Sequence, residues 1–91
     1  METKIGMIAA VSEALRYKKE NPAALHEDII QHISDIAAKE RDMSKKIGMI
    51  AAASRALTYI DKNPAANEKE IIRHVMSQTS DIESKIDLDA E

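Results

Sequence analysis

Cysteine is absent from this chain of 91 residues, which excludes disulfide bonds and thiolate metal sites. The absence is also typical of proteins from reducing compartments, so we expect a cytoplasmic location. Aromatic residues are almost missing as well, since Tyr17 and Tyr59 occur without any Phe or Trp. Two Gly and two Pro leave little turn-forming material, which argues against β architectures. A core of Ile, Leu, Ala and Met therefore predicts an all-α fold.

Long apolar runs and long basic runs are also missing. The longest apolar run, Ile5 to Val11, is far too short to cross a bilayer. Nearly the same run recurs at residues 47–53, which argues against a cleaved leader near the N-terminus. The net charge is −3, and the clustered Lys and Arg that bind phosphate backbones are lacking. We therefore expect no membrane association, and nucleic acid is disfavoured as a partner.

The chain does contain an internal repeat. Residues 1–33 align without gaps on residues 43–75, and 19 of the 33 aligned pairs are identical. We interpret this as gene duplication that produced two helical hairpin repeats, residues 1–42 and 43–86, followed by an acidic tail, residues 87–91. A lone hairpin would expose apolar surface, so we predict that both hairpins form one domain, a four-helix unit. Further dimerisation, or exchange of hairpins between chains, stays open.

Each repeat reads as a helix, a turn and a second helix. The first helix ends at an Asn-Pro pair, because Pro cannot donate a hydrogen bond and restricts the residue before it. Asn21 and Asn63 are suitable N-caps for the second helices. In the second repeat, Asn67 with Glu70 resembles a capping box and offers a later start. The predicted first helices span residues 3–20 and 45–62, and the second helices end near residues 40 and 84, with residues 37–44 as a link that is helical in part.

The two helices of a repeat differ in their apolar faces. The second helix has one apolar face, which in the second repeat extends to Ile82 and Ile86. The first helix is apolar on two faces, and one of them is a ridge of small residues. Gly costs about 1 kcal/mol relative to Ala inside a helix, so its recurrence indicates close approach of another helix, unless both Gly lie at a frayed helix start. The predicted helix-packing interface consists of Gly6, Ala10, Ala14, Gly48, Ala52 and Ala56.

Four aligned pairs carry opposite charges in the two repeats. In a symmetric homodimer, a charged residue near the axis faces its own copy and therefore a like charge. After fusion of the two genes, the residue in one repeat can change to the opposite charge. We therefore hypothesise that at least one pair forms an ion pair across the repeat interface, with random drift of exposed positions as the alternative. The pairs are Glu13/Arg55, Lys19/Asp61, Glu20/Lys62 and Glu27/Lys69.

His32 and His74 are the strongest candidates for metal ligands. Each follows a carboxylate by four residues, Asp28 and Glu70 respectively, so each pair shares one helix face. A two-fold relation between the repeats would unite two imidazoles and two carboxylates, a ligand set that suits zinc or iron. The spacing differs from the Glu-x-x-His motif of di-iron bundles, and the ordinary alternative is an ion pair within each helix.

Other chemistry is sparse in the sequence. Tyr17 and Tyr59 recur near the hairpin turn, where we expect them to cover the end of the core with the hydroxyl in water, with a ligand pocket as the alternative. Ser12 and Ser54 have no His nearby in sequence, and there is no Gly-rich phosphate loop. We therefore expect no catalytic residues, no cofactor and no enzymatic activity.

The sequence favours a non-enzymatic protein-interaction or structural module, which presents a helix surface to a protein partner or to a second copy. The first alternative is a four-helix protein that binds a small ligand or a metal through the paired His and carboxylates. The second alternative is a regulator that contacts nucleic acid through the more basic first helices, although an acidic second helix is a poor recognition helix.

Overall fold

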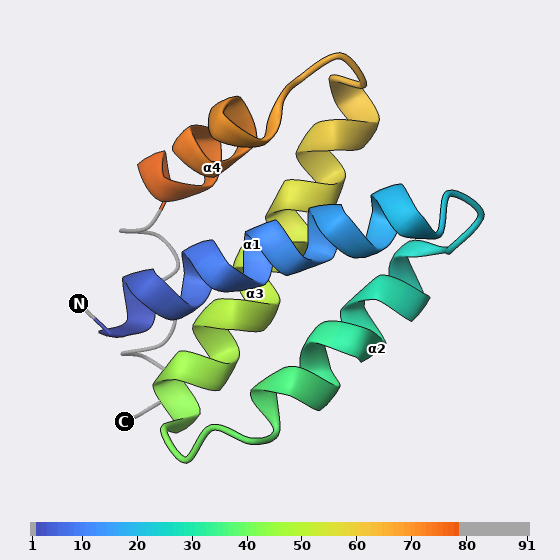
Figure 1. The fold of residues 1–91 in the computed structure, drawn as a ribbon. Coiled ribbons are helices and arrows are strands. Elements are labelled where there is room, and N and C mark those ends of the chain that lie inside the picture. Colours follow the sequence, from blue (N-terminus) through green and yellow to red (C-terminus); the bar gives the residue numbers. More distant parts are fainter. Residues whose placement is uncertain (1, 79–91) are drawn as a thin grey trace.

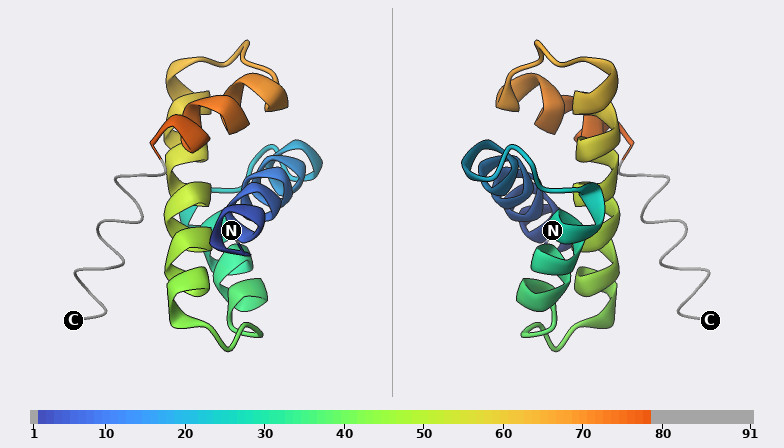
Figure 2. Two further views of the ribbon diagram at one scale, coloured as in Figure 1. Left: turned by 90° about the vertical axis from the view of Figure 1, so that its left-hand side faces the viewer. Right: turned by 90° about the vertical axis from the view of Figure 1, so that its right-hand side faces the viewer.

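The computed structural model describes residues 2–78, with side chains from Lys4 onward, as a helical unit without strands (Figure 1). Helices α1 and α3 make the most extensive contact and cross near their middles (Figures 1 and 2). In the view of Figure 1, α4 lies above α1 and α2 lies below it. The predicted all-α four-helix fold is thus confirmed, and none of these helices has the length and apolar character that a membrane span requires. The helices are α1 (Glu2–Glu20), α2 (His26–Ala37), α3 (Met43–Lys62) and α4 (Glu68–Ser77).

Both first helices end in the same turn. The backbone N–H and the side-chain Nδ2 of Asn21 donate to the carbonyl oxygen of Tyr17, at 2.9 and 3.1 Å. Asn63 makes the same two bonds, at the same lengths, to the carbonyl oxygen of Tyr59. These side chains therefore close the first helices, and the second helices begin several residues later. The prediction that Asn21 and Asn63 cap the second helices is wrong.

The second helices begin with different caps. In α4 the Asn67 side chain accepts a hydrogen bond from the N–H of Glu70 at 2.8 Å, as the later predicted start requires. In α2 the cap position is Leu25, which has no polar side chain. The Asp28 carboxylate accepts from the Leu25 N–H at 3.1 Å instead. The start of α2 consequently lacks one of the bonds that stabilise the start of α4.

The link between the repeats contains less helix than predicted. Helix α2 ends at Ala37, before its predicted end near residue 40. Helix α3 begins after Asp42, whose carboxylate accepts from the Ser44 N–H at 2.9 Å and so caps the helix. Helix α4 ends at Ser77. The second helix of this repeat was predicted to continue to about residue 84. That extension lies outside the described residues, as do Ile82, Ile86 and the tail at 87–91.

The core consists of two clusters, and each receives side chains from three helices. One cluster joins α1, α3 and α4, and the other joins α1, α2 and α3. Every buried member of the first has its aligned residue, 42 positions away, among the buried members of the second. A two-fold relation between the repeats produces such a correspondence. The matched pairs are Met7/Met49, Val11/Ala53, Ala52/Ala10, Ala56/Ala14, Ile71/Ile29 and Val75/Ile33.

The small residues of the predicted ridge lie where α1 and α3 cross. Gly6 and Gly48 are buried, and so are Ala10, Ala14, Ala52 and Ala56. A Cβ added at Gly6 would lie 3.0 Å from Lys45 Cε and 3.4 Å from Met49 Cγ. The first turns of α1 therefore lie against α3 rather than in open solvent, and a larger side chain would have to displace the flexible Lys45.

The two repeats are not packed equally. Helix α2 packs more extensively on α3 than α4 packs on α1. Leu57 of α3 is fully buried, whereas the aligned Leu15 of α1 is only half-buried. Ile5 of α1 is 68% exposed, whereas the aligned Ile47 is half-buried. One face of α1 is therefore left partly uncovered, although the same residues occur in both repeats.

Candidate functional site

The structure does not bring the four predicted metal ligands together. Among residues 2–78 no group of three or more His, Asp or Glu side chains could hold a metal ion. His32 turns to α1, where its Nε2 lies 3.1 Å from Glu13 Oε1. Its ring also stacks on Tyr17, with 4.6 Å between ring centroids. His74 stacks on Tyr59 of its own hairpin in the same way, at 4.2 Å.

The expected ion pairs within the second helices are not formed either. The Asp28 carboxylate caps the start of α2 rather than meeting His32. The Glu70 carboxylate accepts a hydrogen bond from the Tyr59 hydroxyl at 2.9 Å rather than meeting His74. That bond favours the protonated phenol, so it raises the pKa of Tyr59 above its usual range. The Tyr59 hydroxyl thus lies at the surface, where it donates to an exposed carboxylate.

Glu13 is the most strongly engaged carboxylate of the first repeat. It accepts hydrogen bonds from the Arg16 guanidinium, including one from Nε at 3.2 Å, and it also contacts His32. The bond to Arg16, followed by that to His32, lowers the pKa of Glu13 below its usual range. In the second repeat the aligned position holds Arg55, whose Nη1 donates to Gln78 Oε1 at 2.9 Å. The two His residues therefore have different neighbours.

The ion-pair hypothesis for the charge-reversed positions is wrong as stated. None of the four aligned pairs forms an ion pair in the described part of the chain. Asp61 instead approaches two other residues of the first repeat, at 3.6 Å from Lys18 Nζ and 2.9 Å from His26 Nε2. Polar contacts between the repeats exist, but they join one reversed position, Asp61, to residues that neighbour other reversed positions.

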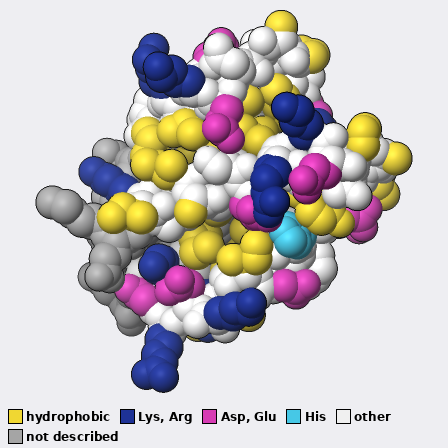
Figure 3. All heavy atoms as spheres, in the orientation of Figure 1, with side chains coloured by type: hydrophobic (Ala, Val, Ile, Leu, Met, Phe, Trp, Pro, Cys, Tyr) yellow, Lys and Arg dark blue, Asp and Glu magenta, His cyan; other side chains and the backbone are white. Residues whose placement is uncertain are grey.

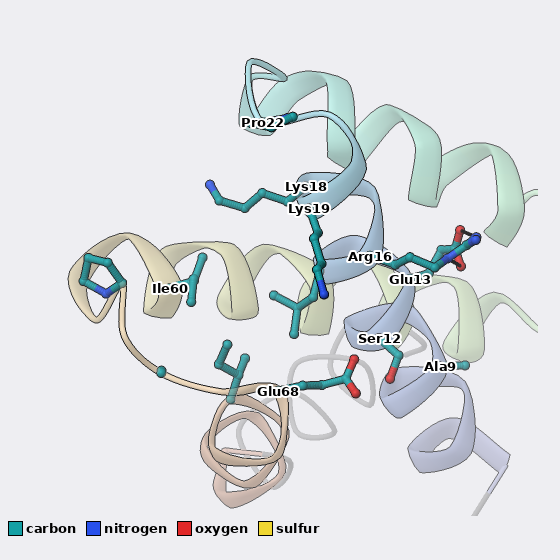
Figure 4. Close-up of a pocket in the computed structure, with 13 residues that line it drawn as sticks. Ala9, Ser12, Glu13, Arg16, Lys18, Lys19, Pro22, Ile60 and Glu68 are labelled. Carbon is teal, nitrogen blue, oxygen red and sulfur yellow. Dashed lines mark hydrogen bonds and ion pairs between the residues drawn. The ribbon is translucent and has the colours of Figure 1, made fainter.

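An open groove of about 1060 Å³ runs between α1 and the α3–α4 hairpin (Figure 4). Apolar side chains also gather on the surface between α1 and α4 in Figure 3. Figure 4 shows Lys19 extending from α1 and Glu68 pointing across from α4, without an ion pair between them. The apolar lining comprises Ala9, Leu15, Pro22, Ile60, Pro64, Ala66 and Ile71, and the polar lining comprises Ser12, Glu13, Arg16, Lys18, Lys19 and Glu68.

The aligned region of the other side is more closely packed, since α2 contacts α3 more extensively than α4 contacts α1. The counterparts of Lys19 and Glu68 are Asp61 and His26, which are in direct contact. The groove was not expected from the sequence, because nearly all of its apolar residues have identical counterparts in the other repeat. The available signals were the exchange of charge at the aligned pairs Lys19/Asp61 and His26/Glu68, and the apolar Ile60 at the position aligned with Lys18.

A second, polar hollow of about 470 Å³ lies against α3 and the end of α4. It contains three groups that can carry positive charge and no carboxylate in its lining. Ser54, for which no nucleophilic role was expected, lies there, whereas Ser12 lines the apolar groove. The lining comprises Ser54, Arg55, Thr58, Tyr59, Lys62, Asn63, His74 and Gln78.

Comparison of the chain with known protein families, with curated proteins and with solved structures found no match.

Proposed function

We propose that the chain is a non-enzymatic protein-interaction module whose α1–α4 groove receives an acidic amphipathic helix of a protein partner. The proposal is carried by the groove itself, whose floor is apolar and whose equivalent on the other side is more closely packed. A helix that lays an apolar face into such a groove is a common mode of peptide recognition. The partly uncovered apolar face of α1, including the largely exposed Ile5, extends the contact area beyond the groove.

The charges along the groove favour an acidic partner. Arg16, Lys18 and Lys19 line it, against two carboxylates. Arg16 is paired with Glu13 and Lys18 with Asp61, but Lys19 makes no ion pair within residues 2–78. An acidic side chain at the edge of a bound helix would find Lys19 available. Such rim charges contribute more to orientation and association rate than to affinity.

The origin and location of the protein form part of the same proposal. We infer that fusion of two gene copies produced the chain, since the two core clusters match residue by residue. A former homodimer would have had two equal grooves, and divergence has left one of them open. We infer a cytoplasmic location from the absence of cysteine.

A synthetic amphipathic helix of about 18 residues, roughly five turns, tests the proposal. One version has a Leu face flanked by Glu, and the other has the same Leu face flanked by Lys. We expect the Glu version to shift the amide resonances of Ala9, Ser12 and Leu15 saturably. The Lys version should associate more slowly and bind more weakly, because Lys19 at the rim would repel it.

Matched variants of the chain locate the binding. Ala9 is exposed and lines the groove, so Ala9→Glu should repel the acidic peptide without disturbing the fold. Ala38 is exposed and does not line it, so Ala38→Glu should bind as the original chain does. Equal binding by both variants, or resonance shifts elsewhere, would refute the groove as the site. If light scattering shows a dimer, and Ala9→Glu dissociates it, the groove binds a second copy of the chain rather than another protein.

A further inference from the structure

The two His–Tyr stacks of the protein have the same geometry but different surroundings. His32 stacks on Tyr17, and His74 stacks on Tyr59, so the imidazoles occupy matching places in the two hairpins. In the first repeat a carboxylate oxygen of Glu13 lies 3.1 Å from the imidazole Nε2. The chain therefore supplies its own anionic oxygen beside the first imidazole.

In the second repeat this carboxylate is replaced by a cation. The residue aligned with Glu13 is Arg55, and the residue aligned with Glu20 is Lys62. Both line the polar hollow beside His74, and the lining contains no carboxylate. Glu70 lies next to the hollow, where it accepts the hydrogen bond of the Tyr59 hydroxyl. The second site thus has the stacked imidazole and two cations, but not the anion of the first site.

We infer that the polar hollow of the second repeat binds an oxyanion, a phosphate or carboxylate group of a small molecule, in the position that Glu13 occupies beside His32. The hollow is large enough for such a group and its attached atoms, at about 470 Å³. The inference does not depend on the groove, which lies on other residues.

The available donors match this chemistry. Arg55 uses Nη1 to bond Gln78, which holds the side chain and leaves its other N–H groups for a planar or tetrahedral oxyanion. Lys62 is exposed and supplies a flexible second charge at the edge. Ser54 is exposed on the same wall, where its hydroxyl can donate. By contrast, the hydroxyl of Thr58 already donates to the Ser54 carbonyl oxygen, at 3.1 Å.

Titration of the full chain with inorganic phosphate, followed by amide and imidazole resonances at constant ionic strength, tests the inference. Saturable shifts are expected at Ser54, Arg55 and His74, in the millimolar range for a half-open site. Sodium acetate is the second arm. Binding of both anions, or of either one alone, supports an oxyanion site and identifies the preferred group.

Variants that restore the residues of the first repeat should close the site. Arg55→Glu and Lys62→Glu are each expected to weaken anion binding at least ~10-fold, since each removes a charge-assisted contact and adds a repulsive carboxylate. Arg73→Glu changes charge equally on an exposed position of α4 outside the hollow, and it should bind as the original chain does. Lys62 is exposed, so Lys62→Glu should fold normally. This variant alone then tests the anion site if Arg55→Glu fails to fold. The inference is overturned if no shift saturates, if Lys62→Glu binds normally, or if Arg73→Glu loses as much affinity.

Discussion

His26 Nε2 lies 2.9 Å from Asp61 Oδ2 and ties the start of α2 to the end of α3. The aligned residues of the other side, Glu68 and Lys19, face the α1–α4 groove from opposite walls and form no ion pair within the described residues (Figure 4). This polar contact is thus one of the differences between the two sides, together with the fuller burial of Leu57 than of Leu15.

Transplanting the closing contact should close the groove. The double variant Lys19→Asp, Glu68→His introduces at the α1–α4 groove the residue types of Asp61 and His26, which are in contact on the other side. We expect it to bind the acidic amphipathic peptide at least ~10-fold more weakly, and more weakly than Lys19→Asp alone, which reverses the rim charge without supplying the contact. Fluorescence anisotropy of the labelled peptide measures the difference. If the double variant binds as well as the single one, the contact does not control access to the groove.

Replacing Glu13 by Gln should destabilise the chain in a pH-dependent way. The hydrogen bonds of Glu13 lower its pKa in the folded state, so its contribution is present above the pKa of the unfolded chain and is lost as pH falls through the folded value. Glu13→Gln should cost about 0.5–1.5 kcal/mol at neutral pH, and the cost should shrink in acid. Urea denaturation of both proteins at neutral and acid pH checks this. A cost that stays constant with pH would contradict the assigned role.

Enlarging the small-residue ridge should be costly. Ala10 and Ala52 are buried where α1 and α3 cross. Ala10→Leu or Ala52→Leu should therefore overpack the crossing and cost roughly 1–3 kcal/mol. Ala9 is exposed on the same helix, and Ala9→Leu should change stability by less than about 0.5 kcal/mol. Thermal melting compares them, and an unchanged midpoint for both buried variants would place the ridge in solvent.

Adding the missing cap should stabilise α2. Leu25 is 64% exposed at the cap position of α2, where α4 has Asn67. Leu25→Asn should gain about 1 kcal/mol, the usual contribution of an N-cap. Asn67→Ala should lose a similar amount, which gives an internal calibration of the same measurement. Chemical denaturation that shows no gain for Leu25→Asn would mean that the Asp28 bond already satisfies this helix start.

The repeated pattern allowed the fold to be predicted from the sequence. Helical periodicity, the shortage of turn formers and the internal repeat each indicate two hairpins, and the four-helix unit follows from the need to bury the apolar faces. The start of α2 could not be predicted, because Asn21 suits either the end of one helix or the beginning of the next. Its two bonds to the Tyr17 carbonyl oxygen decide between them.

The candidate sites were less accessible from the sequence. His32 has a carboxylate four residues earlier, but its partner is Glu13, which lies 19 positions away and is brought close by the hairpin. The groove was hidden for another reason. Leu15 and Leu57 are identical in type and aligned in position, yet only Leu57 is fully buried. A difference that arises from packing between identical residues leaves no trace in the sequence pattern.

Thiol labelling of the aligned leucines tests the central claim, that the α1–α4 side is more open than the α2–α3 side, most directly. The chain has no cysteine, so Leu15→Cys and Leu57→Cys each give a single thiol. We expect Leu15→Cys to react with a maleimide much faster than Leu57→Cys under native conditions, and the acidic amphipathic peptide to slow Leu15→Cys alone. Equal labelling rates, or a Leu15→Cys rate that the peptide leaves unchanged, would contradict the account.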